Sequence, residues 1–383
     1  MIEKVESRFF INWAYVILLI AVIFTNVFYE DLANVLYLYP KVNERNYTQV
    51  HFINVGQGDA IALTFANGQT MLVDSGTELY SDELLTYLDK MVIKNNTIDF
   101  VVLTHPDSDH SSNMLKIINK YKIGKFYRPN VYEISEGKEP YCENYNYKKI
   151  LDALNNKNIP TYMANNFVYF EAGNAKINFL SQTDGMIADY EGTNSISPVI
   201  IVEENNSKLM LTGDIDSKIE ERLIDLYGDE LDIDILKLAH HGSNNSNSEE
   251  FLEHTSPRTA VVSVGENRYG HPSNDTIERI LKYDVSNNAN LYDNFYSTIN
   301  DGNIIITLNE NLLMQSIDNI NKYIFVPYYL FTIIISLVIL FFLAKPYMVY
   351  LIKYIKFEFE NRRYKRLKQK GLLIEKSKKL EKT

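Results

Sequence analysis

The stretch "VVLTHPDSDHSSNM", residues 101–114, places two histidines and two aspartates within six positions. The residues before it, "IDFVVLTH", predict a buried strand, and "SSNMLKIINKY" predicts a helix with a serine cap behind it. A loop between a strand and a helix can point alternate side chains into one cleft. We therefore expect His105 and Asp107 to reach one metal ion, and Asp109 and His110 to reach another. A solvated polar turn is the alternative, which four ligand-type residues in six positions disfavour.

The ligand chemistry is restricted to nitrogen and oxygen. The chain has a single cysteine, Cys142, so a disulfide within the chain and a thiolate zinc cage are both excluded. Imidazole and carboxylate ligands suit zinc or manganese, and Asp107 in place of a further imidazole favours the harder manganese. We expect two divalent metal ions, zinc or manganese.

Two more polar clusters follow predicted strands. "LMLTGDID" delivers Asp214 beside a glycine, where a carboxylate can bridge two ions, although a plain Gly-Asp turn is the alternative. "LKLAHHGSNNS" contains His240 and His241. Adjacent side chains on an extended backbone point apart, so one of the pair is expected to bind an ion. The other can donate a proton to a leaving group or touch substrate. We assign His241 to the ion and His240 to catalysis, with the reverse assignment open.

Two further residues are assigned to catalysis. His271 in "YGHP" lies on a loop and is a candidate for leaving-group assistance, with simple exposure as the alternative. Asp109 is expected both to bind metal and to take part in the reaction.

The region around residues 45–310 predicts one domain without repeats. "QVHFINVGQGDAIALTFANGQTMLVDSG" predicts a β-meander with a turn at Asn67-Gly68, and "SPVIIVEENNSKLMLTGDI" predicts a hairpin turned at Asn205-Asn206. Amphipathic stretches such as "SKIEERLIDLYG" predict helices between the strands. A meander and helix followed by another meander and helix favour an α/β fold, an αββα sandwich of two sheets between helices.

These motifs together resemble a known family. "VHFINVGQGDA", "MLVDSGT", "THPDSDH", "LTGDID", "AHHGSNNS", "YGHP" and "STINDGNIII" are similar, in order and spacing, to the metallo-β-lactamase-fold domain of the ComEC/Rec2 competence proteins. The resemblance implies that Asp74 orients the histidine loop and that Asp59 lines the floor of the cleft. Asp107 stands where lactamases proper carry a histidine. A further lactamase histidine is absent, since "TNSISPVIIVE" offers only Thr193, Asn194 and Ser197 in that region.

Two apolar segments flank this domain. "INWAYVILLIAVIFTNVF" (11–28) has 18 residues, and "IFVPYYLFTIIISLVILFFL" (324–343) has 20 residues and no charge. Each is long enough to cross a bilayer, with a buried core helix, or a signal peptide for the first, as the alternative. We expect an anchor in residues 1–29 and a transmembrane helix in residues 323–344.

The distribution of charged residues predicts how the chain is oriented in the membrane. Residues 345–383 carry 13 Lys and Arg against 4 Asp and Glu, residues 1–27 are balanced, and the whole chain is −11, so residues 28–344 carry −20. The basic tail, 345–383, beside a span is expected in the cytoplasm and in contact with anionic lipid. Two spans then place both termini in the cytoplasm and the middle domain outside the cell membrane.

The sequence therefore predicts a membrane-anchored, metal-dependent hydrolase that cleaves phosphodiester bonds. In this hypothesis two ions activate a water for attack on phosphorus, and Asp214 holds both ions. The resemblance implies DNA or RNA as substrate. The alternatives are a cell-envelope phosphoesterase similar to phosphorylcholine esterases and a non-catalytic surface-binding protein. No obligate protein partner is inferred.

Overall fold

Two units make up the chain, and all the polar clusters lie in one of them. Residues 42–322 form that unit, and residues 1–41 and 323–383 form the other. The computed structural model describes residues 17, 20, 21, 24, 46–93, 95–129, 131–133, 141–142, 144–165, 168–180, 192–309, 312, 314–317 and 328–369.

The first sheet carries the predicted meander. Within the described residues it has eight strands in the order β17-β16-β1-β2-β3-β4-β5-β8. Strands β1, β2 and β3 pair antiparallel in sequence, and β4 and β5 then add in parallel. The strands are β1 (Gln49–Phe52), β2 (Ile61–Thr64), β3 (Thr70–Val73), β4 (Thr97–Val102), β5 (Lys122–Arg128), β8 (Thr161–Met163), β16 (Asn303–Thr307) and β17 (Met314–Ile317).

The second sheet begins with antiparallel strands and ends with parallel ones. It has seven strands in the described part of the chain, in the order β15-β14-β13-β12-β11-β10-β9. Asn205 and Asn206 join β11 to β12 with φ of 50° and 63°, which confirms the predicted hairpin turn. The strands are β9 (Tyr169–Ala172), β10 (Ala175–Leu180), β11 (Val199–Glu204), β12 (Ser207–Leu211), β13 (Ile235–Lys237), β14 (Thr259–Val262) and β15 (Phe295–Ser297). A small pair, β6 (Tyr132–Glu133) and β7 (Tyr141–Cys142), lies apart.

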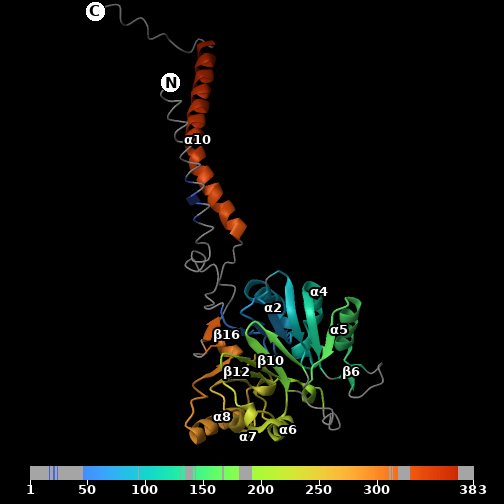
Figure 1. The fold of residues 1–383 in the computed structure, drawn as a ribbon. Helices are drawn as coiled ribbons and strands as arrows, with labels where there is room; N and C mark the ends of the chain where they lie inside the picture. The colour runs from blue at the N-terminus through green and yellow to red at the C-terminus, as the bar shows by residue number, and fades with distance from the viewer. Residues whose placement is uncertain are drawn as a thin grey trace, which may run out of the picture. The chain divides into compact units, whose positions relative to one another are not determined.

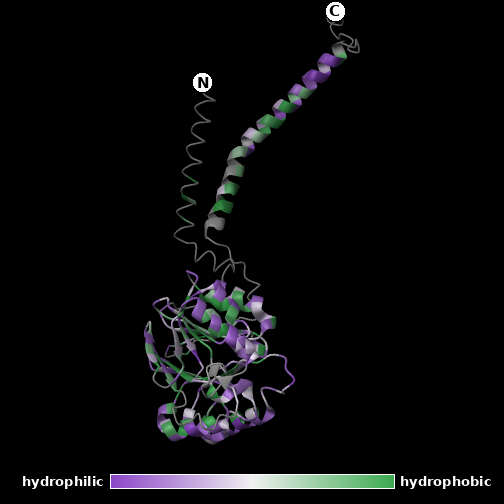
Figure 2. Cartoon of the chain, turned by 90° about the vertical axis from the view of Figure 1, so that its right-hand side faces the viewer, coloured by the Kyte–Doolittle hydropathy of each residue, from purple (hydrophilic) through white to green (hydrophobic). Residues whose placement is uncertain are grey.

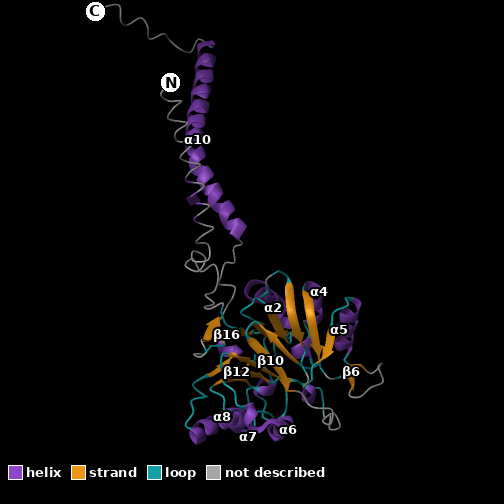
Figure 3. Cartoon of the chain, viewed as in Figure 1, coloured by secondary structure: helices purple, strands orange, loops and turns teal. Residues whose placement is uncertain are grey.

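The two sheets bury one core between them, and helices cover their outer faces (Figure 1 and Figure 3). Phe52 and Val102 of the first sheet share this core with Phe179 and Leu209 of the second. Figure 2 shows hydrophobic strands running through the interior of the unit. The predicted αββα arrangement is confirmed. The helices are α2 (Ser81–Tyr87), α3 (Ser108–Ser111), α4 (Met114–Lys120), α5 (Tyr145–Asn156), α6 (Ser217–Tyr227), α7 (Glu249–Thr255), α8 (Asn274–Asn287) and α9 (Thr298–Asp301).

Outside that unit, the structure describes the helix α10 (Tyr328–Gln369). The predicted anchor at 11–28 lies almost wholly outside the described residues. Among the residues that are described, no helix combines the length and the apolar character needed to cross a membrane. The two flanking transmembrane helices therefore stay predictions.

Parallel strands place the functional loops at one edge of the sandwich. Strands β3 and β4 run parallel in one sheet, and β12, β13 and β14 run parallel in the other. The carboxyl ends of parallel strands meet at the same edge of a sheet, where open α/β folds place their ligands. The polar clusters all follow these strands: Asp74 after β3, His105 after β4, Asp214 after β12 and the histidine pair after β13.

Candidate metal centre

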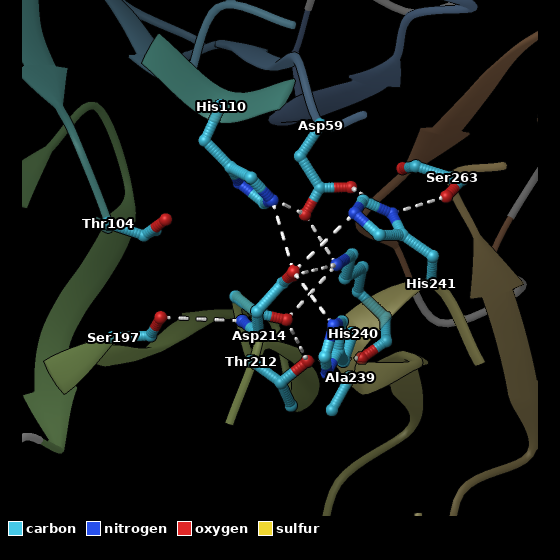
Figure 4. Close-up of polar contacts among 12 residues, drawn as sticks. Asp59, Thr104, His110, Ser197, Thr212, Asp214, Ala239, His240, His241 and Ser263 are labelled. Carbon is cyan, nitrogen blue, oxygen red and sulfur yellow. Dashed lines mark hydrogen bonds and ion pairs between the residues drawn. The ribbon is translucent and has the colours of Figure 1, made fainter. Parts of the chain in front are cut away.

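Asp214 lies at the centre of the site, at the end of the turn that leaves β12 (Figure 4). Its carboxylate is 2% exposed, and Gly213 before it has φ of +54°, with room for no side chain because a Cβ would lie 2.8 Å from Ser197. Asp214 Oδ2 lies 3.3 Å from His110 Nε2 and 3.5 Å from His241 Nε2. His240 Nε2 at 3.8 Å and His105 Nε2 at 4.0 Å face the same oxygen. One carboxylate oxygen is thus the meeting point of four imidazoles.

Four of the predicted ligands form a group that fits a divalent cation. Asp109, His110, Asp214 and His241 each bring one ligand atom, and these atoms all lie within 4.8 Å of one another. Two nitrogens and two carboxylate oxygens are ligands that zinc and manganese accept.

The outer nitrogen of each buried histidine fixes its tautomer. His110 Nδ1 donates to Asp74 Oδ2 at 2.7 Å, and His241 Nδ1 donates to the Ser263 carbonyl at 2.8 Å. When these rings are neutral, their Nε2 atoms therefore carry the free lone pair and point into the site. In the described residues both Nε2 atoms are buried without a hydrogen-bond partner, as is His105 Nε2. Buried acceptors without donors are costly, and a bound cation would satisfy them.

Asp74 supports two of the three histidines. It is fully buried in the left-handed region, with φ of 59°, and it accepts hydrogen bonds from Thr104 N at 2.7 Å and Thr104 Oγ1 at 2.6 Å. Since the Thr104 hydroxyl gives its proton to Asp74, it can only accept from His105 Nδ1, 3.0 Å away. The structure thus brings Asp74 into the orienting position that the family resemblance implies.

The charges of the cluster shift the pKa values of its own side chains. Burial alone would lower the pKa of His110, but Asp214 and Asp74 raise it well above its ordinary range. Burial would also lower the pKa of His241, but the neighbouring carboxylates of Asp214 and Asp109 raise it. Burial would raise the pKa of Asp214, but His110 and His241 hold it well below its usual value. Without an ion, the raised pKa values favour protonated His110 and His241 beside the Asp214 carboxylate, and a bound cation would take the place of their Nε2 protons.

Asp109 and His110 reach the site from a helical turn, which corrects the predicted loop. The helix expected from Ser111 begins only at Met114, and the turn α3 already starts at Ser108. Ser75 N and Ser75 Oγ both donate to the His110 carbonyl, which pins this turn to the loop after β3. The turn points Asp109 and His110 towards Asp214, with Asp109 Oδ2 3.4 Å from His241 Nε2.

His105 and Asp107 lie together but outside the four-residue group. His105 Nε2 is 4.0 Å from Asp107 Oδ2, and burial, followed by the charge of His110, lowers the pKa of His105 well below its ordinary value. Thr193 Oγ1 donates to Asp107 Oδ1 at 2.6 Å, and Ser197 Oγ lies 3.3 Å from His105 Nδ1. The hydroxyl groups of Thr193 and Ser197 thus lie beside His105 and Asp107, in the segment that lacks the lactamase histidine.

His240 and His241 take different positions, but not by the extended geometry that the sequence predicts. Strand β13 ends at Lys237, and both histidines are left-handed, with φ of 50° and 53°. Asn247 holds this turn, accepting from Ala239 N at 2.8 Å and donating to the Ala239 carbonyl at 3.0 Å. His241 is buried in the cluster, whereas the side chain of His240 is 29% exposed.

His271 lies next to His240 at the outer side of the site. Their ring centroids are 5.7 Å apart in an edge-to-face arrangement, and the ring of Tyr269 is 5.6 Å beyond His271. Burial is the main cause that lowers the pKa of both His240 and His271. Both rings are therefore neutral at pH 7 and suit accepting a proton or orienting a substrate better than acting as an imidazolium acid.

Asp59 lies on the floor of the site, paired with a residue that the sequence reasoning missed. Lys237 forms an ion pair with Asp59 Oδ2, and both side chains are buried. The available signal was a lone lysine inside the apolar strand "DILKLAHH", directly before the histidine pair. Thr104, Ser263 and Asn247 were also missed, because their roles depend on contacts distant in sequence.

The comparisons with known proteins agree with this geometry. Residues 53–266 match the Metallo-beta-lactamase superfamily, more than half of the chain. The chain belongs to that superfamily. It is 25% identical over 268 residues to ComE operon protein 3 of Bacillus subtilis, covering 65% of this chain and 32% of that protein. It is 29% identical over 246 residues to Recombination protein 2 of Haemophilus influenzae, covering 61% of this chain and 26% of that one.

The chain spans about a third or less of the length of these relatives, and the predicted resemblance to competence proteins is confirmed. Among solved structures, the metallo-beta-lactamase fold protein YhfI from Bacillus subtilis is similar, with a TM-score of 0.41 and 11% identity over 66% of this chain and 96% of that one. Superfamily membership and the His/Asp cluster identify the chain as having a metal-dependent hydrolase fold.

Proposed function

We propose that this metallo-beta-lactamase superfamily protein is a metal-dependent phosphodiesterase that acts on nucleic acid. The observation that carries the proposal is the convergence on Asp214 Oδ2, where Asp109, His110 and His241 complete a cation site. A divalent cation there, zinc or manganese, supplies Lewis-acid polarisation of a phosphoryl oxygen and makes water a nucleophile at neutral pH. We expect that His105 and Asp107, beside Asp214, would hold a second cation.

The side chains around the cation site have separate roles in metal binding, substrate orientation and proton transfer. His110 and His241 present Nε2 because Asp74 and the Ser263 carbonyl hold their Nδ1 protons. His240 and His271, half-buried and neutral at pH 7, lie at the outer side and can orient the phosphoester or accept a proton from the attacking water. Asp109 lies beside His241 in the cation site and stays ionised, since the neighbouring His241 and His110 lower its pKa by more than burial raises it.

Nucleic acid is favoured by two facts. One similar protein is named Recombination protein 2, and another, 29% identical over 250 residues, is Competence protein ComA of Neisseria gonorrhoeae. In addition, Tyr269 is 76% exposed, and its ring lies beside His271, where it can stack on a base next to the bond that is cleaved.

A second candidate is a phosphoesterase that acts on a small or envelope-borne phosphoester. The net charge of −20 over residues 28–344 disfavours a broad polyanion-binding face and suits a short substrate held mainly by the metal centre. A substrate screen with bis-p-nitrophenyl phosphate, single-stranded DNA, duplex DNA and p-nitrophenyl phosphorylcholine, with each metal, separates the two candidates.

The test of the enzymatic proposal uses the full-length chain and its Asp214→Ala variant. We expect at least one equivalent of zinc or manganese and hydrolysis of bis-p-nitrophenyl phosphate, with both lost in Asp214→Ala. Asp225→Ala, an exposed aspartate on α6, is the matched control and should retain both. A wild-type chain with less than one equivalent, and no loss in Asp214→Ala, would instead indicate a non-catalytic surface-binding protein.

We also propose that the enzyme is anchored in the cell membrane with its catalytic domain outside. The uncharged segment 324–343, the apolar segment 11–28 and the basic tail support this topology. Protease added to intact cells should cleave the middle domain and spare an epitope at the C-terminus. Cleavage of the tail with protection of the middle domain would show the opposite orientation.

A further inference from the structure

Lys237 is a buried cation on the floor of the metal centre. Its side chain is fully buried, and its ammonium forms an ion pair with Asp59 Oδ2. The same Nζ lies 3.9 Å from Asp214 Oδ1 and donates to the Gly213 carbonyl at 3.2 Å. Lysine is almost never fully buried unless it is paired, and Asp59 supplies the partner here.

The acidic residue that Lys237 pairs with belongs to a second group of ligand atoms. Asp59, Asp74 and His110 bring three such atoms within 4.8 Å of one another, and all three side chains are buried. In the described residues, Asp59 Oδ1 is buried without a hydrogen-bond partner. The His110 atom in this group is Nδ1, which donates to Asp74. The two carboxylates, joined by this nitrogen once its proton is released, would attract a divalent cation next to the one at Asp214.

We infer that Lys237 is a built-in cation that takes the place of a metal ion at Asp59 and leaves only Asp214 Oδ2 to the catalytic metal. The inference rests on the proposed function in one respect, that the catalytic cation binds at Asp214. Lys237 is a positioning residue, since its fully buried ammonium reaches no substrate.

The geometry explains what this cation achieves. Lys237 faces Asp214 Oδ1, whereas the imidazoles of His110, His240 and His241 all face Oδ2. One oxygen of the carboxylate therefore faces the ammonium, and the other faces the imidazoles of the metal site. An ion at Asp59 would instead compete for His110, whose ring both groups share.

Two substitutions separate the charge of Lys237 from the space that it fills. Lys237→Ala removes the ammonium and leaves room for an ion beside Asp59. Lys237→Met also removes the charge but fills that room with an apolar chain of similar length. The metal content of the full-length chain is measured after dialysis against manganese at neutral pH. We expect Lys237→Ala to bind about one equivalent more than wild type, Lys237→Met to bind no more than wild type, and Lys237→Ala/Asp59→Asn to lose the extra equivalent.

Thermal unfolding covers the case in which Lys237→Ala is unstable. If an ion replaces the ammonium, manganese should raise the melting temperature of Lys237→Ala by more than it raises that of Lys237→Met. A Lys237→Ala chain that gains no equivalent, or that manganese does not stabilise beyond Lys237→Met, overturns the inference. A wild-type chain without metal would overturn the proposed function, while the difference between the two variants still decides the role of Lys237.

Discussion

At the scale of single residues, Asp74 shows how a buried carboxylate decides which atom of a histidine is available. Its Oδ2 accepts the Nδ1 proton of His110, which leaves Nε2 unprotonated and directed towards Asp214. Acceptors behind metal-binding imidazoles set the tautomer and the orientation of the ring.

We predict that Asp74→Asn weakens metal binding by about 10- to 100-fold. The amide NH₂ would face His110 Nδ1 and favour the tautomer that protonates Nε2, as occurs when an orienting aspartate of a catalytic triad is replaced by asparagine. Asparagine tolerates the left-handed backbone at this position, so the fold should persist. Calorimetric titration with zinc measures the effect. Unchanged affinity in a folded variant would show that Asp74 does not orient His110.

The raised pKa values of His110 and His241 predict opposite pH trends for stability and for metal binding. In the metal-free chain the folded pKa of each histidine lies above the ordinary value of 6.5, so their stabilisation is complete below about pH 6.5 and is lost as pH rises through the raised values. Metal must displace these protons, so its affinity should increase by about tenfold per pH unit for each proton displaced. Titrations between pH 6 and pH 8 test this, and an affinity independent of pH would contradict it.

At the scale of elements, the loop from Gly265 to Ser273 positions an exposed ring beside the site. Asn267 Oδ1 accepts from the backbone N–H groups of Tyr269 and His271 at 3.0 Å each, and its Nδ2 donates to the His271 carbonyl at 2.8 Å. These bonds hold Tyr269 in place although its side chain is largely in solvent.

We predict that Tyr269→Ala raises the KM for a single-stranded oligonucleotide, because stacking of one base contributes about 1–3 kcal/mol. Tyr269→Phe keeps the ring and should behave as wild type. The KM for bis-p-nitrophenyl phosphate should change less than the KM for the oligonucleotide. Equal KM values for the oligonucleotide in Tyr269→Ala and Tyr269→Phe would exclude a stacking role.

At the scale of the whole molecule, the metal centre joins the two sheets. Asp74 and His110 come from the side of the first sheet, and Asp214 and His241 come from the second. A cation bound between them therefore cross-links the two halves of the sandwich, and its binding free energy adds to the stability of the fold.

We predict that chelation lowers the melting temperature of the chain by about 10 °C. An ion present at 1,000 times its dissociation constant stabilises by about 4 kcal/mol, and each kcal/mol corresponds to roughly 2–4 °C in a domain of this size class. Differential scanning fluorimetry with and without EDTA measures the shift. Asp214→Ala should show little shift, and a shift of equal size in that variant would place the stabilising ion elsewhere.

The sequence by itself determined the fold and most of the candidate metal ligands. Alternation of apolar runs, the asparagine turn at 205–206 and polar residues at strand ends depend on local pattern, which the linear chain displays directly. The motif at residues 105–110 therefore supplied four candidate site residues, of which Asp109 and His110 lie in the four-residue group.

Only the tertiary structure decided which of these residues lie together in the metal site and which pair with other side chains. The left-handed turn at His240 and His241, the separation of His105 and Asp107 from the four-residue group, and the pairing of Lys237 with Asp59 all depend on contacts between segments far apart in sequence. A lysine within an apolar strand has no visible partner in the sequence, and its carboxylate comes from the opposite sheet. Burial and long-range pairing set the charge of a side chain, and neither is a property of its neighbours in the chain.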